Sequence, residues 1–129
     1  MPLPDMVGIV VSDLKASLKF YRLLGLEIPE GAEKEDHVEV TTRNGYRIAW
    51  DTEQLVKSFA PDWVQPTGQR IGIAFKCDSP AEVDILYNRI IAQGYEGKKE
   101  PWDAFWGQRY AQVADPDGTV IDLFAPLKK

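Results

Sequence analysis

The sequence has 129 residues, of which 44% are hydrophobic and 27% charged, a composition that allows one compact soluble fold. Its apolar runs are far shorter than the roughly 20 residues that cross a bilayer, so we expect no membrane-spanning segment. A formal net charge of −5 disfavours nucleic acid as a partner and is compatible with a neutral or cationic small molecule.

The start of the chain and its cysteine content predict a cytoplasmic protein. The first residues lack a basic segment followed by an apolar stretch, so no signal peptide is expected. The chain has one cysteine, Cys77, which excludes an intrachain disulfide and fits a reducing compartment.

The first half of the chain predicts a strand, a helix and three extended pieces. An apolar strand at residues 6–11 precedes a helix with Asp13 as its N-cap and Gly25 as its end. The apolar face of this helix follows helical spacing and consists of Leu14, Leu18, Tyr21 and Leu24. The extended pieces are predicted at residues 25–28, 36–42 and 46–51, and a hairpin turn joins the last two.

The second half repeats this order. A strand at residues 70–77 leads to a helix with Ser79 as its N-cap, Pro80 in first position and Glu82 completing a capping box. Three further strands are predicted, with a DPDG turn before the last, at residues 95–98, 108–114 and 119–124.

Landmark residues support an internal repeat. The pairs are 66, 69 and 73 residues apart, namely Tyr21 and Tyr87, Gly25 and Gly94, and Gly45 and Gly118. We therefore predict an α+β fold in which one domain contains two βαβββ modules, residues 1–51 and 70–126, with a linker at 52–69. One helix covers one face of such a small sheet, so the modules are expected to form a shared cleft, and a homodimer is expected.

Three stretches carry a resemblance to a known superfamily: VGIVVSDLKASLKFYRLLGLE, GIAFKCDSPAEVDILY and WGQRYAQVADPDGTVIDLF. They resemble the vicinal oxygen chelate superfamily, which includes glyoxalase I, extradiol dioxygenases and the bleomycin-resistance proteins. The resemblance implies the glyoxalase/bleomycin-resistance fold and a small-molecule site in the cleft.

The resemblance also implies where metal ligands would lie. Metal enzymes of the superfamily place a ligand at the start of the first strand and near the end of the last strand of each module, usually His and Glu or Gln. The corresponding residues here are Met6, Ala49, Gly72 and Asp122. Only the carboxylate of Asp122 suits a divalent metal. We therefore expect no metal, no cofactor and no catalytic residue, as in the metal-free bleomycin-resistance-type branch.

Two polar residues have alternative interpretations. Asp122 is either a structural carboxylate hydrogen-bonded to backbone or tyrosine, or an anionic anchor for a cationic group. His37, which is the only histidine, is either a half-exposed strand residue or lines the cavity and exchanges one hydrogen bond with a ligand.

Aromatic residues make up 11% of the chain and gather in the stretch EPWDAFWGQRY. This stretch contributes four rings that suit stacking on a ring-bearing or cationic ligand, namely Trp102, Phe105, Trp106 and Tyr110. The same rings could instead plug the sheet or form a dimer interface. Strand alternation places Gln112 on the same face as Tyr110, and either Ala49 or Trp50 points inward.

The sequence thus favours a metal-free protein that sequesters a small aromatic or cationic molecule. The predicted ligand-binding residues are His37, Trp50, Trp102, Phe105, Trp106, Tyr110, Gln112 and Asp122. The alternative is a metal-dependent lyase, isomerase or dioxygenase of the same superfamily with a non-standard metal site. A regulatory or interaction module is a third class, which no sequence feature favours.

Overall fold

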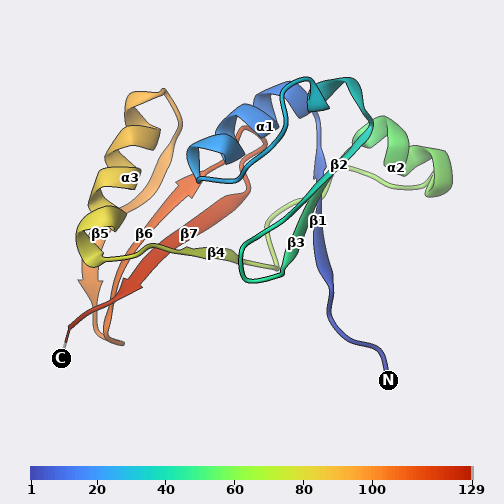
Figure 1. Ribbon diagram of the computed structural model, residues 1–129. Helices are drawn as coiled ribbons and strands as arrows, with labels where there is room; N and C mark the ends of the chain where they lie inside the picture. Colours follow the sequence, from blue (N-terminus) through green and yellow to red (C-terminus); the bar gives the residue numbers. More distant parts are fainter. Residues whose placement is uncertain (129) are drawn as a thin grey trace. The chain divides into compact units, whose positions relative to one another are not determined.

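The computed structural model describes residues 1–128 and divides the chain into two compact units (Figure 1). Unit one comprises residues 1–65, and unit two begins at Pro66. Each unit combines a β-sheet with helices, so the predicted α+β fold is confirmed. None of the helices in residues 1–128 has the length and apolar character needed to cross a bilayer.

Unit one contains a three-stranded sheet in the order β1-β3-β2. Its elements are β1 (Met6–Val11), α1 (Leu14–Leu23), the 3-10 turn η1 (Ala32–Lys34), β2 (His37–Thr41), β3 (Arg47–Thr52) and α2 (Glu53–Phe59). Strand β3 pairs parallel with β1 and antiparallel with β2. Asp13 caps α1 as predicted, because its carboxylate accepts a hydrogen bond from the N–H of Ala16 at 3.2 Å.

The buried face of α1 forms the core of unit one. Leu18, Phe20 and Tyr21 are 0% exposed. The Tyr21 ring lies 5.3 Å from that of Trp50 on β3, which is also 0% exposed. Burial of aromatic side chains of this size dominates core energetics, so this contact fixes the helix on the strand.

Residues 25–28, which were expected to be extended, form no strand. The Arg22 side chain donates hydrogen bonds to the carbonyls of Ile28, at 3.1 Å, and Pro29, at 2.8 Å. The N–H of Ile28 donates to the carbonyl of Leu26 at 3.1 Å, and a proline has no N–H to offer. Because these backbone groups are satisfied locally, they do not pair with the sheet. From β1 to β3, unit one therefore has the order βαββ and not the predicted βαβββ. The prediction of a strand at residues 25–28 was wrong.

The segment predicted as a linker, residues 52–69, begins with a helix. Thr52 is the N-cap of α2, and its hydroxyl accepts a hydrogen bond from the N–H of Leu55 at 3.1 Å. Glu53 adds a negative charge to the first turn, where the helix dipole favours it. The rest of the segment, residues 60–69, contains no helix or strand.

Unit two has the predicted βαβββ order and a four-stranded sheet in the order β4-β7-β6-β5. Its elements are β4 (Ile73–Lys76), α3 (Pro80–Ala92), β5 (Gly97–Ala104), β6 (Gln108–Ala114) and β7 (Val120–Pro126). Ser79 caps α3 by accepting from the N–H of Glu82 at 3.2 Å. The Glu82 carboxylate accepts from the N–H of Asp78 at 2.5 Å, so the capping box is shifted by one residue.

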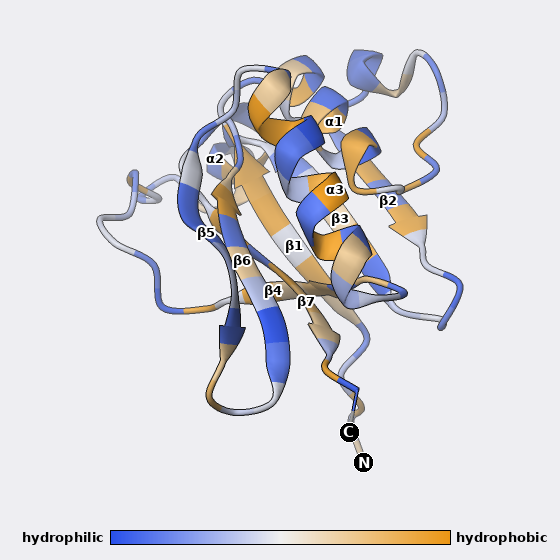
Figure 2. Ribbon diagram, turned by 90° about the vertical axis from the view of Figure 1, so that its left-hand side faces the viewer, coloured by the Kyte–Doolittle hydropathy of each residue, from blue (hydrophilic) through white to orange (hydrophobic). Residues whose placement is uncertain are grey.

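Helix α3 covers one face of the unit-two sheet (Figure 1) and shows alternating hydrophobic and hydrophilic bands (Figure 2). The strand residues beneath it are 0% exposed, namely Ala111, Val113, Ile121, Leu123 and Ala125. Strand alternation turns the intervening residues of β6 and β7 to the opposite face. In residues 66–128, α3 is the only helix, so unit two leaves that second face, here called the open face, uncovered.

Candidate functional site

The strand register arranges the open face in two rows of side chains. One row consists of Trp102 on β5, Tyr110 on β6 and Phe124 on β7. The other consists of Lys99 on β5, Gln112 on β6 and Asp122 on β7. The first row is aromatic and the second is polar, so the open face presents a ring surface beside charged groups.

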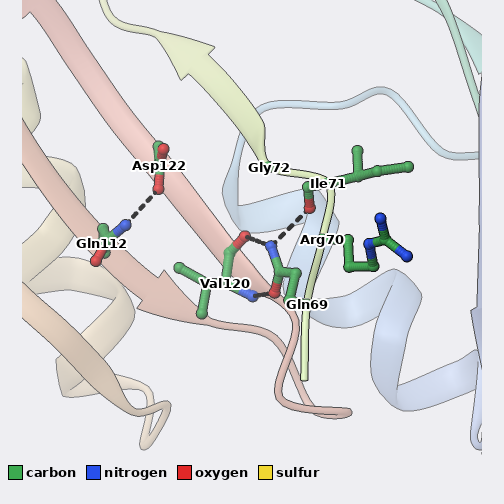
Figure 3. Close-up of a pocket in the computed structure, with 7 residues that line it drawn as sticks. All are labelled: Gln69, Arg70, Ile71, Gly72, Gln112, Val120 and Asp122. Atoms are coloured by element: carbon green, nitrogen blue, oxygen red, sulfur yellow. Dashed lines mark hydrogen bonds between the residues drawn. The ribbon is translucent and has the colours of Figure 1, made fainter. Parts of the chain in front are cut away.

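The carboxylate of Asp122 accepts two hydrogen bonds from its neighbours on β6. The Tyr110 hydroxyl donates to Oδ2 at 2.5 Å, and the Gln112 amide donates to Oδ1 at 2.9 Å, as Figure 3 shows for Gln112. Both donors are neutral, so these bonds orient the carboxylate without neutralising its charge, and its oxygens keep further accepting capacity. The hydrogen bond from tyrosine that the structural interpretation of Asp122 predicted is present. This geometry is equally compatible with an anionic anchor, so the choice between the two interpretations stays a prediction.

A cavity of about 290 Å³ lies beside this carboxylate (Figure 3). It is lined by Gln69, Arg70, Ile71, Gly72, Gln112, Val120 and Asp122. Asp122 is the only carboxylate in this lining and Arg70 the only cation. In Figure 3 the Arg70 guanidinium lies on the far side of its segment from Asp122, so it does not neutralise the carboxylate.

One wall of the cavity is the segment before β4, and Gln69 fastens it to β7. The Gln69 amide nitrogen donates to the carbonyls of Val120, at 3.1 Å, and Ile71, at 2.8 Å. Its amide oxygen accepts from the N–H of Val120 at 2.6 Å. The side-chain amide thus pairs with Val120 in the way that a backbone peptide would. Sequence reasoning missed Gln69, because no local pattern distinguishes it from other exposed polar residues.

The aromatic cluster consists of five rings: Trp102, Phe105, Trp106, Tyr110 and Phe124. The Trp102 ring lies 5.8 Å from both Trp106 and Tyr110. Trp106 lies 5.3 Å from Tyr110 and 5.0 Å from Phe105, and Tyr110 stacks on Phe124 at 6.3 Å. All four predicted rings are therefore together, and Tyr110 links them to Asp122. Phe124 was missed, although its position two residues after Asp122 places it on the same strand face.

Two rings of the cluster are exposed, while Trp102, Tyr110 and Phe124 are half-buried on the sheet. Phe105 is 96% exposed and Trp106 is 48% exposed. Trp106 is held in place because its indole N–H donates to the side-chain oxygen of Gln108 at 2.8 Å. An oriented ring with an exposed face can stack on another planar group.

Two predicted ligand residues lie in unit one. Trp50 is 0% exposed and packs on Tyr21, and its buried indole N–H has no hydrogen-bond partner in the described chain. The His37 side chain is 42% exposed at the start of β2, and its Nδ1 is hydrogen-bonded to Asp51. Within unit one, Trp50 belongs to the core and His37 to the surface of a strand. The role of both residues in ligand binding stays a prediction.

The four expected metal-ligand positions do not fit a divalent metal site. Met6, Ala49 and Gly72 offer a thioether, a methyl group and a hydrogen, which are poor or impossible ligands for hard and borderline cations. The fourth residue, Asp122, is already bonded to Tyr110 and Gln112. In residues 1–128 no group of three or more His, Cys, Asp or Glu side chains is arranged to hold a metal ion.

Cys77 does not provide a reactive thiolate. The side chain is 6% exposed, and burial, followed by the charges of Glu82 and Asp78, raises the pKa of its thiol to about 11. The thiol is therefore protonated at neutral pH, and a thiol is a far weaker nucleophile than a thiolate. Cys77 is therefore a small core residue.

The contact between Tyr110 and Asp122 predicts a pH dependence. Burial, the hydrogen bond to Asp122 and the charge of Asp122 raise the pKa of Tyr110 to about 12. The pKa of an unfolded tyrosine is about 10, so the contribution of Tyr110 to stability is complete below pH 10 and is lost between about pH 10 and 12. Because burial also raises the pKa of Tyr87 and of Tyr95, we expect phenolate absorbance to show several late-titrating tyrosines, one of which Tyr110→Phe removes. Asp122→Asn should lower the pKa of Tyr110, and an unchanged value would contradict this account.

The comparisons with known proteins identify the class. The family model for the Glyoxalase/Bleomycin resistance protein/Dioxygenase superfamily matches residues 4–123, so the chain belongs to this superfamily. A search of curated proteins finds no significant match. The predicted superfamily is thus confirmed, while the metal-free branch within it stays a prediction.

Solved structures share the fold over nearly the whole chain. A glyoxalase/bleomycin resistance protein/dioxygenase from Nocardioides is 27% identical with a TM-score of 0.76, covering 99% of this chain and 85% of that chain. A family enzyme from Burkholderia phytofirmans PsJN is 21% identical with a TM-score of 0.83, covering 95% and 98%. A lactoylglutathione lyase from Agrobacterium tumefaciens is 19% identical with a TM-score of 0.69, covering 94% and 91%. These likenesses support the glyoxalase/bleomycin-resistance fold.

Proposed function

We propose that the protein binds and sequesters a small aromatic molecule with a cationic group, on the open face of unit two and without a metal. One observation carries this proposal: the aromatic cluster leads through Tyr110 directly to the charged carboxylate of Asp122. The rings offer a stacking surface, and the carboxylate offers an anchor. The family membership adds a fold in which small-molecule sites are common, while the donor set does not fit a metal.

Magnitudes support a ligand that uses both features. Aromatic pairs contribute about 0.5–1.5 kcal/mol beyond their area burial. A hydrogen bond between an ammonium group and a carboxylate contributes about 1.5–3 kcal/mol. The cavity of about 290 Å³ is slightly smaller than the roughly 300–1,000 Å³ typical of ligand pockets. It therefore suits a ligand of one to three rings, part of which lies over the aromatic cluster.

The first test uses three ring compounds that are cations at neutral pH and contain one, two or three rings: benzylamine, 4-(aminomethyl)biphenyl and proflavine. We expect at least one to bind, and the double substitution Trp102→Ala with Trp106→Ala to weaken that binding about five- to thirtyfold, since each ring supplies about 0.5–1 kcal/mol to a bound cation. Calorimetry gives the affinities.

The control is Ile85→Ala, which removes a 58% exposed apolar side chain from α3 on the opposite side of the sheet. It should leave binding unchanged. Absence of binding by all three amines would contradict the proposal. So would purified protein that contains stoichiometric zinc, nickel, manganese or iron and loses a lyase, isomerase or dioxygenase activity on chelation, because that result establishes the competing function.

We further propose that the protein is a cytoplasmic homodimer. The ring of Phe59 on α2, which is 71% exposed and lies outside the aromatic cluster, supports a dimer, because large exposed aromatics are enriched at interfaces. The unpaired, buried Cys77 is compatible with a reducing compartment. Light scattering tests the dimer, and a monomeric mass at micromolar concentration would contradict it.

A further inference from the structure

The open face carries a cation that the proposed function does not use. Lys99 on β5 lies opposite Gln112 on β6, which in turn lies opposite Asp122 on β7. Neighbouring strands are about 4.8 Å apart, so the backbones of Lys99 and Asp122 are separated by roughly 10 Å. The row therefore has a negative charge on one strand and a positive charge two strands away.

The ammonium group of Lys99 has a ring as its partner. Its Nζ lies 4.8 Å from the ring centroid of Trp102, in the aromatic cluster. The adjacent Lys98 is ion-paired with Glu96 at 3.5 Å, and Arg109 is paired with Asp84 and Asp103. In residues 1–128 Lys99 has no ion pair. An anion that approached Lys99 would therefore not have to displace an internal carboxylate.

The position of Lys99 affects any cationic ligand on the cluster. A ligand with only a positive charge that stacks on Trp102 meets the like charge of Lys99, which costs binding free energy. A ligand that also carries a negative group near Lys99 converts this repulsion into attraction. The register shifts on both sides of Lys99 mark irregularities in β5, a feature that re-aims side chains at functional sites.

We propose that the ligand is an aromatic zwitterion, with its cationic group at Asp122 and an anionic group, carboxylate or phosphate, at the ammonium group of Lys99 two strands away. This inference rests on the proposed function and specifies the ligand class of the same site. Lys99 is then the residue that distinguishes a zwitterion from a simple aromatic cation.

The test compares three probes that share one ring system: 4-(aminomethyl)biphenyl, biphenyl-4-carboxylate and 4'-(aminomethyl)biphenyl-4-carboxylate. We expect the zwitterion to bind roughly three- to tenfold more tightly than the cation, which is the range for an exposed to partly buried charge pair. The carboxylate probe should bind most weakly. This advantage of the zwitterion should decrease as salt concentration rises.

The variants assign the effect to one side chain. Lys99→Gln should abolish the preference for the zwitterion and leave the cation bound equally or more tightly, while Lys99→Arg should retain the preference. The matched control is Lys98→Gln, which removes the same charge from the adjacent, ion-paired position and should leave all three affinities unchanged.

The outcomes separate this inference from the proposed function. If the cation binds in an Asp122-dependent way and the zwitterion binds no more tightly, the inference is wrong and the proposed function stands. Lys99 then only protects the edge strand from pairing with other chains. If Lys98→Gln and Lys99→Gln have equal effects, general electrostatics explains the preference and the inference is wrong. If neither the cation nor the zwitterion binds, both proposals fail.

Discussion

Replacing Asp122 with asparagine is expected to weaken the binding of 4-(aminomethyl)biphenyl about tenfold to a hundredfold, and to leave the fold intact. The substitution removes the charge and keeps the shape of a side chain that holds Tyr110 and Gln112. A hydrogen bond to a charged group is worth about 1.5–3 kcal/mol, and each 1.4 kcal/mol is a factor of ten in affinity. Calorimetry on both proteins measures the change, and circular dichroism checks the fold.

The matched control for this substitution is Asp103→Asn. It removes the same charge from the same unit, but Asp103 is paired with Arg109, which also contacts α3 on the covered side of the sheet. Binding should change less than twofold, since long-range effects of exposed charges are screened in physiological salt. Equal losses in the two variants would show that net charge, and not an anchor at Asp122, governs affinity.

Replacing Trp50 with alanine is expected to destabilise unit one by about 3–5 kcal/mol, the usual cost of truncating a large buried aromatic side chain. The ring is 0% exposed and contacts Tyr21, so its removal leaves a cavity between β3 and α1. Denaturant unfolding measures the change in the free energy of unfolding.

A milder substitution separates a core role from the predicted ligand role of Trp50. Trp50→Phe keeps much of the ring and removes an indole N–H that has no hydrogen-bond partner. We expect it to retain both the fold and the affinity for 4-(aminomethyl)biphenyl. A large loss of affinity at unchanged stability would show that Trp50 takes part in ligand binding.

Unit two could be predicted closely from the sequence because its local signals agree. The strand predicted at residues 108–114 coincides with β6, and the alternation that buries Ala111 and Val113 leaves Tyr110 and Gln112 half-buried on the opposite face. Ser79 and Pro80 fixed the start of α3 for a local reason, since both act within the first turn. The pairing of Trp102 with Tyr110 puts these two predicted rings on one face, while Phe105 and Trp106 lie in the turn between β5 and β6.

The failures have a different origin, because they depend on side-chain contacts that no local hydrophobic pattern indicates. The guanidinium of Arg22 satisfies carbonyls at residues 28 and 29, which no extended pattern at 25–28 reveals. Trp50 and Ala49 are adjacent, and only the packing of Tyr21 shows which of the two faces the helix. Strand periodicity gives two faces but does not say which one a helix will cover.

The wall of the cavity that precedes β4 is attached to β7 by one side chain, Gln69. Gln69 bonds to Val120, 51 positions later in the chain, through a single amide that contacts only backbone atoms of that residue. Arg70 and Ile71, which line the cavity, follow Gln69 directly in the chain, and the side chain of neither residue takes part in these hydrogen bonds. Mutations at these two positions can therefore change the lining of the cavity while the hydrogen bonds between Gln69 and Val120 persist, so the shape of the cavity can diverge between relatives that keep the same fold.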